Sequence, residues 1–196
     1  MEPAGWQQRL PFCERLPKVE LHAHLNGSIR DSTIRELAEK RQAEAPLVAE
    51  DALRLTNKGQ LAPVVEDFAA DNVCYLELRT TPKSNPGAGM SKQSYIEAVL
   101  AGLLPFMRAE TAWLDARNKH QGPPSSAASG MPIVVRLVLS IDRRESTQGA
   151  LDTVRLAVQL RSQGVVGIDL SGNPSIGQWC PTRVSRKQCW TLHRTD

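Results

Sequence analysis

Two histidines near the N-terminus, His22 and His24, have the residue type and the spacing that a metal site requires. They lie in residues 18–25, where polar and apolar side chains alternate strictly. Such alternation predicts a β-strand, in which successive side chains point to opposite faces. The two imidazoles would then project from one face, roughly 6–7 Å apart by strand rise. Two neutral imidazoles in this arrangement can share one metal ion, and this ligand type suits zinc.

A bare His-x-His pair also has an ordinary interpretation, because most such pairs are surface residues or satisfied polar side chains. Taken alone, the pair favours that ordinary interpretation over a metal site. Residues 26–28, Asn-Gly-Ser, end the predicted strand with turn-forming types and supply a cap for a following helix. The pair is therefore placed at the carboxyl end of a strand, and the rest of the chain must decide between the two interpretations.

The elements that would position this pair follow from the hydrophobic pattern. Residues 73–79 and 165–170 are predicted as strands, and residues 133–139 form a nearly continuous apolar run, typical of a strand buried on both faces. Apolar residues at intervals of three and four predict helices between the strands, including a long one that starts near Ser91. Strands that alternate with helices predict an α/β fold with a parallel sheet. Four strands are half the number in a (β/α)8 barrel.

Polar or turn-forming residues follow each predicted strand, and reactive groups of α/β barrels gather at this carboxyl end. Each position has a simple structural explanation: a turn, a helix cap, a backbone accommodation or a solvated charge. Their common location favours one shared site instead. The candidates are His22, His24 and Asn26 at the first strand, Thr80, Thr81, Pro82 and Lys83 at the second, Asp142 at the third and Gly172 at the fourth.

Residues 16–28, Leu-Pro-Lys-Val-Glu-Leu-His-Ala-His-Leu-Asn-Gly-Ser, closely resemble the first-strand signature of the adenosine deaminase family. Residues 75–82 and 167–172 resemble later segments of the same family, in the right order. Asn26 stands where nucleoside-preferring members usually carry Asp, and in this it is similar to the adenosine deaminase-like branch, the N6-methyl-AMP deaminases. The resemblance implies a (β/α)8 TIM barrel of the metallo-dependent hydrolase type, of which this chain would supply the first half.

The resemblance assigns roles to the candidate residues. His22 and His24 would be two ligands of one Zn2+ ion. The nucleotide site would be lined by His24, Asn26, Thr80, Thr81, Pro82, Lys83, Asp142 and Gly172. A neutral amide at Asn26 can donate a hydrogen bond to a 5′-phosphate that a carboxylate would repel, and Lys83 can add charge attraction.

The reaction implied by the resemblance is zinc-dependent hydrolytic removal of an amine from C6 of a purine nucleotide, with N6-methyl-AMP converted to IMP and methylamine. Adenosine deamination is an alternative. The family also needs a third His ligand, a catalytic Glu, a second catalytic His and a pair of Asp residues, and none can be placed, since the only His after Gly172 is His193 and no Glu follows it. We therefore assign no catalytic residue and expect an incompletely ligated metal ion and impaired activity. The alternative is an inactive fragment or an isoform that only binds.

The predicted organisation is a lead-in over residues 1–15, a partial barrel domain over 16–178 and a basic tail over 179–196. The apolar residues of the tail show neither the helical nor the strand period. The sequence departs from the family pattern at Trp179, so we expect a truncated or alternatively spliced form. The formal net charge of +3 lies in the last seventeen residues, and the remainder gives no sign of a nucleic-acid surface. Nucleic-acid binding by the tail is a weaker alternative.

The composition also bears on compartment and partners. No apolar run approaches the roughly 20 residues that a membrane helix needs, and the first residues lack a signal-peptide pattern. The four cysteines form no Cys-x-x-Cys pair and are expected to be reduced. We expect a cytosolic protein that binds a small purine nucleotide, with neither a nucleic acid nor a membrane as partner, and that is monomeric in the complete family form.

Overall fold

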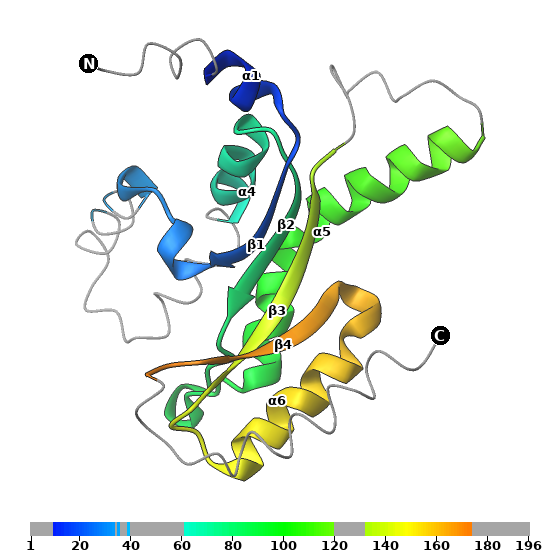
Figure 1. The fold of residues 1–196 in the computed structure, drawn as a ribbon. Helices are drawn as coiled ribbons and strands as arrows, with labels where there is room; N and C mark the ends of the chain where they lie inside the picture. The colour runs from blue at the N-terminus through cyan, green and yellow to red at the C-terminus, as the bar shows by residue number, and fades with distance from the viewer. Residues whose placement is uncertain (1–9, 34, 36–38, 40–60, 120–131, 174–196) are drawn as a thin grey trace, which may run out of the picture.

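The computed structural model describes residues 10–33, 35, 39, 61–119 and 132–173. Within this part, four strands form one sheet in the order β1-β2-β3-β4, and each neighbouring pair is parallel (Figure 1). This confirms the predicted α/β fold with a parallel sheet. The strand bounds are β1 (Lys18–His24), β2 (Val73–Thr80), β3 (Val134–Asp142) and β4 (Val165–Ser171).

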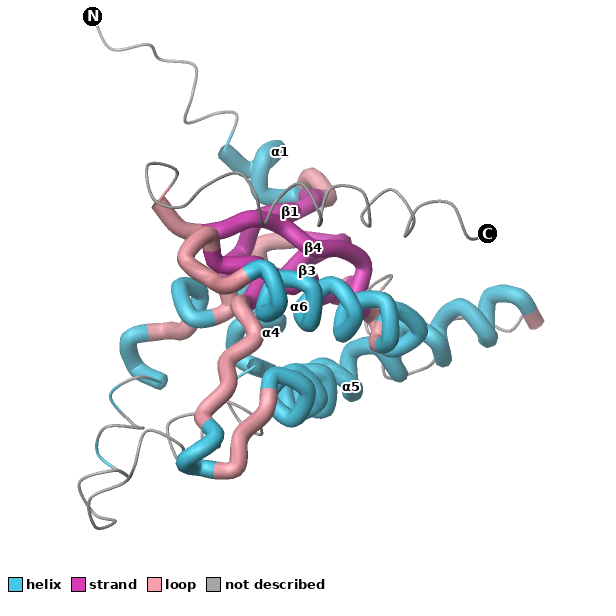
Figure 2. The backbone as a smooth tube through the Cα atoms, turned by 90° about the horizontal axis from the view of Figure 1, so that it is seen from below, coloured by secondary structure: helices cyan, strands magenta, loops and turns pink. Residues whose placement is uncertain are grey.

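Helices connect the strands and lie on one side of the sheet (Figure 2). Parallel strands need such crossovers, and a helix on each crossover covers one sheet face. The long helices are α4 (Leu61–Ala70), α5 (Lys92–Asn118) and α6 (Thr147–Gln159). The shorter ones are α1 (Leu10–Arg15) before β1, and the 3-10 turns η1 (Asn26–Ser28), η2 (Pro86–Ala88) and η3 (Arg161–Gln163).

Serine caps set the starts of α5 and α6. Ser91 accepts a hydrogen bond from the backbone N–H of Ser94 at 3.0 Å, and the Ser94 hydroxyl accepts one from the N–H of Ser91 at 3.0 Å, which makes a reciprocal capping box. Ser146 accepts a hydrogen bond from the N–H of Gly149 at 3.1 Å. The predicted start of the long helix near Ser91 is therefore confirmed.

The core lies between the sheet and these helices. Leucines of β2 and β3, such as Leu76 and Leu137, are fully buried and belong to one apolar cluster with Ile96 and Leu103 of α5. Two residues on the opposite side of β3, Val138 and Ser140, are buried as well. Residues on both faces of this strand are thus buried, as its continuous apolar pattern predicted.

The apolar side of β1 is only partly covered. Ala23 and Leu25 are buried, but Val19 and Leu21 are 59% and 53% exposed. Among the described strands, β1 pairs only with β2, so it is an edge of the sheet. Strict alternation predicted the strand correctly, yet an edge strand leaves part of its apolar side uncovered.

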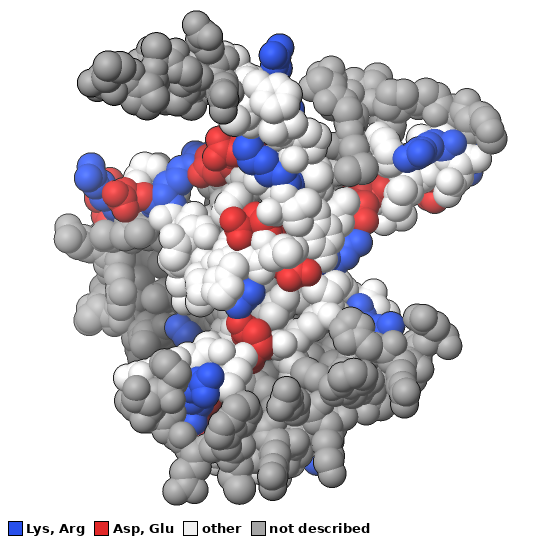
Figure 3. Space-filling view, in the orientation of Figure 1, with Lys and Arg blue, Asp and Glu red and all other residues white. Residues whose placement is uncertain are grey.

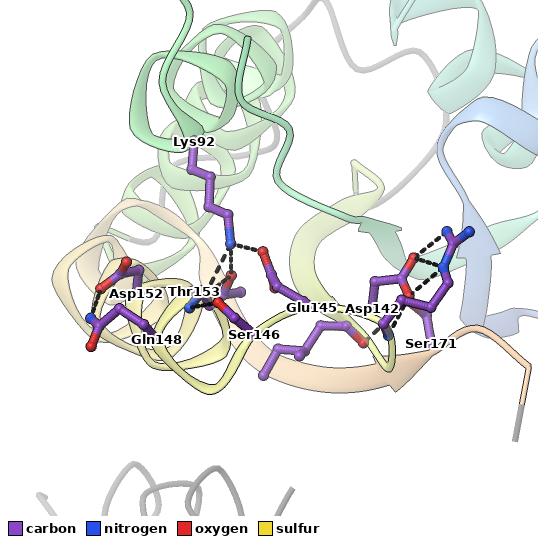
Figure 4. A network of polar contacts seen from close by, with 11 residues as sticks. Lys92, Asp142, Glu145, Ser146, Gln148, Asp152, Thr153 and Ser171 are labelled. Carbon is purple, nitrogen blue, oxygen red and sulfur yellow. Dashed lines mark hydrogen bonds and ion pairs between the residues drawn. The ribbon is translucent and has the colours of Figure 1, made fainter. Parts of the chain in front are cut away.

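A lysine joins α5 to the loop that enters α6. Lys92 Nζ pairs with Glu145 and donates hydrogen bonds to the carbonyl of Gly149 at 2.9 Å and the hydroxyl of Thr153 at 3.0 Å (Figure 4). Thr153 is fully buried, so this contact lies in the interface of the two helices. It fixes the loop that begins at the carboxyl end of β3.

The open face of the sheet, opposite the long helices, carries side chains of both charges. Figure 3 shows Lys and Arg interspersed with Asp and Glu on this face. None of the described helices is both long and apolar enough to cross a membrane. The predicted tail, residues 179–196, and most of the lead-in lie outside the described residues.

Candidate functional site

The imidazoles of His22 and His24 converge at the carboxyl end of β1. Their Nε2 atoms are 3.3 Å apart, and the ring centroids are 5.1 Å apart with the planes tilted by 54°. Two nitrogen ligands of a tetrahedral zinc ion, each about 2.0–2.1 Å from the metal, stand about 3.3–3.4 Å apart. The pair therefore fits two of the four ligand positions. The described residues contain no group of three or more His, Cys, Asp and Glu side chains that could hold a metal.

The chain leaves β1 in a fixed turn. Ser28 Oγ donates a hydrogen bond to the carbonyl of His24 at 2.8 Å, and the N–H of Leu25 donates to the carbonyl of Arg79 on β2 at 3.0 Å. Leu25 is almost fully buried, which anchors the turn in the core. Asn26 is consequently held at the rim of the sheet next to the histidines.

A cavity of about 240 Å3 lies at the carboxyl ends of the strands. Ligand pockets usually have about 300–1,000 Å3, so the described residues form part of such a pocket. Five of the predicted nucleotide residues line it, together with four residues that the sequence did not single out. The lining consists of His24, Leu25, Asn26, Arg79, Thr80, Thr81, Lys83, Ser140 and Ser171.

Three predicted residues lie outside this lining. Pro82 is buried beside it. Asp142 is the last residue of β3, not one past its end, and it pairs in register with Ser171. Gly172 has a φ of +94°, at which another residue would be strained, and an added Cβ would be in tight contact with Asp142 Oδ1 at 3.3 Å. Asp142 pairs with Ser171 of the cavity wall and Gly172 follows it in the chain, and contact of any of the three residues with a nucleotide stays a prediction.

The carboxylate of Asp142 is already engaged. It accepts hydrogen bonds from Arg144 Nη2 at 2.6 Å and from the Arg144 backbone N–H at 2.8 Å (Figure 4). The side-chain bond first, and the backbone bond second, lower the pKa of Asp142 to about 2. The group is therefore ionised and paired at neutral pH.

Thr80 lines the cavity, but its hydroxyl is bonded elsewhere. That hydroxyl is buried against α5, where it forms a 2.7 Å hydrogen bond with the Tyr95 hydroxyl. Burial raises the pKa of Tyr95, so this phenol stays protonated. The bond ties the end of β2 to α5 and leaves the next residue, Thr81, at the cavity.

The residues missed by the sequence prediction had a signal. Arg79 and Ser171 immediately precede predicted residues at the ends of their strands, and Ser140 lies two residues before Asp142 on the same face of β3. The described lining contains Arg79 and Lys83 and no acidic side chain. Because Arg79 is ion-paired with Asp169, the positive charge of Lys83 is what favours an anionic ligand at this lining.

The sequence model of the adenosine deaminase family matches residues 60–180. The chain belongs to the adenosine deaminase family. Within the family, it is 43% identical to the N6-mAMP deaminase of Arabidopsis thaliana over 197 residues, which cover 87% of this chain and 56% of the relative. It is 33% identical to the N6-methyl-AMP deaminase of Bos taurus over 208 residues, which cover 91% of this chain and 53% of the relative.

Solved structures give the same result for the fold. The crystal structure of Arabidopsis ADAL complexed with IMP matches this adenosine deaminase family member with a TM-score of 0.67 and 39% identity, over 93% of this chain and 56% of that chain. The chain spans about half the length of the curated relatives it matches. The predicted resemblance is confirmed, and the four parallel strands are part of the family's barrel.

Proposed function

We propose that the carboxyl ends of β1 to β4 form part of the active site of a zinc-dependent purine nucleotide deaminase. Its substrate is N6-methyl-AMP, and water replaces the amine at C6 to give IMP and methylamine. The observation that carries the proposal is the 3.3 Å separation of the Nε2 atoms of His22 and His24 next to an anion-compatible cavity.

The metal part of the proposal follows from the geometry of this pair. Both Nε2 lone pairs can be directed at one point, and His24 also lines the cavity, so the ion and the ligand would share one wall. A bound zinc ion supplies Lewis-acid activation of water near neutral pH. The remaining ligand positions and the proton-transferring acid would come from groups outside the described residues.

The nucleotide part follows from the lining. Asn26 is exposed and neutral, so its amide can donate a hydrogen bond to a 5′-phosphate without charge repulsion. Lys83, also exposed, adds a positive charge on the same rim. The hydroxyls of Thr81, Ser140 and Ser171 can orient the ribose. The relative whose structure holds IMP is similar to this chain over 93% of this chain and 56% of the relative.

The experiment is a deaminase assay on the purified 196-residue chain with added Zn2+ and N6-methyl-AMP. The ultraviolet shift to IMP is the readout, and the full-length Arabidopsis relative is the positive control. We expect slow turnover that is abolished in the double variant His22→Ala, His24→Ala. Turnover that survives in this variant would contradict the assigned metal pair.

Two alternatives have distinct outcomes when binding of Zn2+ and IMP is measured alongside turnover. A chain that binds Zn2+ and IMP but does not turn over is a binding-only form, which fits the two metal ligands among the described residues. A chain that deaminates adenosine faster than the nucleotide acts on the nucleoside. Failure to bind either Zn2+ or IMP would reject the proposed site.

A further inference from the structure

Strand β1 carries an irregularity at the histidine pair. Glu20 pairs with Leu76 and Ala23 pairs with Leu78, so two residues of β1 lie opposite one residue of β2. This is a β-bulge, which adds local twist and re-aims a side chain. The bulge contains Leu21 and His22, and from this backbone the Nε2 atom of His22 comes to 3.3 Å from that of His24.

Charged side chains bond the backbone groups of the bulge. The carbonyl of Leu21 accepts a hydrogen bond from Arg79 Nη2 at 2.8 Å, and the N–H of His22 donates one to Glu20 Oε1 at 2.6 Å. Backbone polar groups displaced from a ladder need other partners. Arg79 and Glu20 supply these partners, so they determine the backbone conformation from which His22 projects.

Arg79 is itself anchored on the far strand. Its Nη1 forms an ion pair with Asp169 of β4, and the two side chains are only 11% and 23% exposed. The carbonyl of Arg79 also accepts the N–H of Leu25 at 3.0 Å. Arg79 therefore bonds the backbone on both sides of the histidine pair, at Leu21 and at Leu25. Its ion pair with Asp169 of β4 holds the Arg79 side chain in place.

We propose that Arg79, held by Asp169, is a positioning residue that sets the separation of the two histidine Nε2 atoms. Glu20 supplies a second contact, because its carboxylate accepts the hydrogen bond from the next backbone group, the N–H of His22. The inference rests on the proposed function, in which His22 and His24 hold the metal. Arg79 does not ligate the metal; its planar fork lets one side chain bond a carboxylate and a carbonyl at once.

The test compares Arg79→Gln and Asp169→Asn with Arg136→Gln in the full 196-residue chain. Arg136 forms a similarly buried pair with Glu110 of α5, and its hydrogen bonds among the described residues go to Glu110 and to the carbonyl of Val135, not to β1. Zn2+ affinity is measured by competition with a chromogenic chelator, and the free energy of unfolding by urea denaturation.

We expect Arg79→Gln and Asp169→Asn to lower Zn2+ affinity by roughly 10–100-fold, the usual effect of losing an outer-shell partner. Arg136→Gln should leave the affinity within about twofold while destabilising the chain as much as Arg79→Gln does. Arg79→Lys keeps the charge but not the fork, so its affinity should lie between those of wild type and Arg79→Gln. Equal loss of affinity in Arg79→Gln and Arg136→Gln would show a merely structural role and overturn the inference.

A metal-free measurement separates this inference from the proposed function. The side-chain nitrogen shifts of His22 and His24, and amide exchange at His22, report the bulge in the absence of zinc. Both should change in Arg79→Gln and stay as in wild type in Arg136→Gln. Unchanged values in Arg79→Gln overturn the positioning role even if zinc binds. A wild-type chain that binds no zinc rejects the proposed metal site, while these shifts still decide the role of Arg79.

Discussion

In the proposed site, single side chains at the rim of the cavity should decide which ligand is preferred. Asn26 and Lys83 are both exposed, and the described lining holds no carboxylate that would repel a phosphate. Asn26 is uncharged, so a carboxylate placed there would add a repulsion, whereas removal of Lys83 would take away one solvent-screened attraction.

The substitution Asn26→Asp should therefore weaken IMP much more than inosine. Placing a carboxylate near a phosphate adds repulsion, and we expect about a tenfold loss for IMP, or about 1.4 kcal/mol, with inosine nearly unchanged. Lys83→Ala should weaken IMP by a smaller factor that shrinks as salt is raised. Isothermal titration with both ligands measures these ratios. Equal losses for IMP and inosine would place the phosphate elsewhere.

The Asp142 carboxyl gives a pH-dependent prediction. Hydrogen bonds from Arg144 lower its pKa from the usual 3.8 to about 2, so the folded pKa lies below the unfolded one. Its contribution to stability is present above about pH 4 and is lost as the pH falls towards 2. In Arg144→Ala the backbone bond remains, so the pKa should return part of the way to 3.8. A carbon NMR titration of Asp142 measures this.

The control for that titration is Arg155→Ala, which removes the partner of Asp152 on α6 and leaves Asp142 untouched. The Asp142 curve should be the same in this variant as in wild type. Identical curves in Arg144→Ala and wild type would mean that the Arg144 guanidinium does not set the pKa.

Gly164, in the turn into β4, and Gly167, inside β4, differ in whether the backbone conformation requires a glycine. Gly164 ends η3 with a φ of +104°, a region that other residues enter at a cost. The added methyl of an alanine there would also crowd the end of Met107, which is flexible and can move aside. Gly167 lies inside β4 without a positive φ, and an added Cβ would meet nothing within 4 Å.

The expected effects of alanine at these positions are opposite in sign. Gly164→Ala should lower the free energy of unfolding by about 1–2 kcal/mol, because the backbone strain remains after Met107 moves. Gly167→Ala should be neutral or stabilising by up to about 1 kcal/mol, because it reduces the entropy of the unfolded chain. Urea denaturation of both variants measures the difference. Similar destabilisation by both would contradict the argument.

At the scale of the whole molecule, the described sheet has two edges. Strand β1 pairs only with β2 and β4 only with β3 among the described strands, and apolar side chains on both edge strands, such as Val19 of β1 and Val166 of β4, are exposed. Unpaired strand edges with exposed apolar residues promote association between chains. In a closed barrel the same edges would pair with further strands.

We therefore expect the purified 196-residue chain to self-associate at micromolar concentration. The double substitution Val19→Lys, Val166→Lys should shift it towards the monomer, because charges on an edge strand oppose pairing. Leu114→Lys on α5 replaces another exposed apolar residue away from either edge and should have no effect. Size-exclusion chromatography with light scattering measures the mass. A wild-type chain that elutes as a monomer would contradict the prediction.

Local patterns in the sequence determined the four strands, the start of α5 at its serine cap and the family, because periodicity and capping act over a few neighbouring residues. They also placed His24, Asn26, Thr81 and Lys83 at one end of the sheet, since parallel strands share their carboxyl edge.

Only the tertiary structure decided the rest. The bulge at His22 depends on the register between β1 and β2, which alternation does not specify where an edge strand is partly uncovered. The pairing of Arg79 with Asp169 joins residues 90 positions apart, and the choice of partner depends on which strands lie side by side. The sequence thus supplied the two histidines, and the structure gave the 3.3 Å distance between their Nε2 atoms.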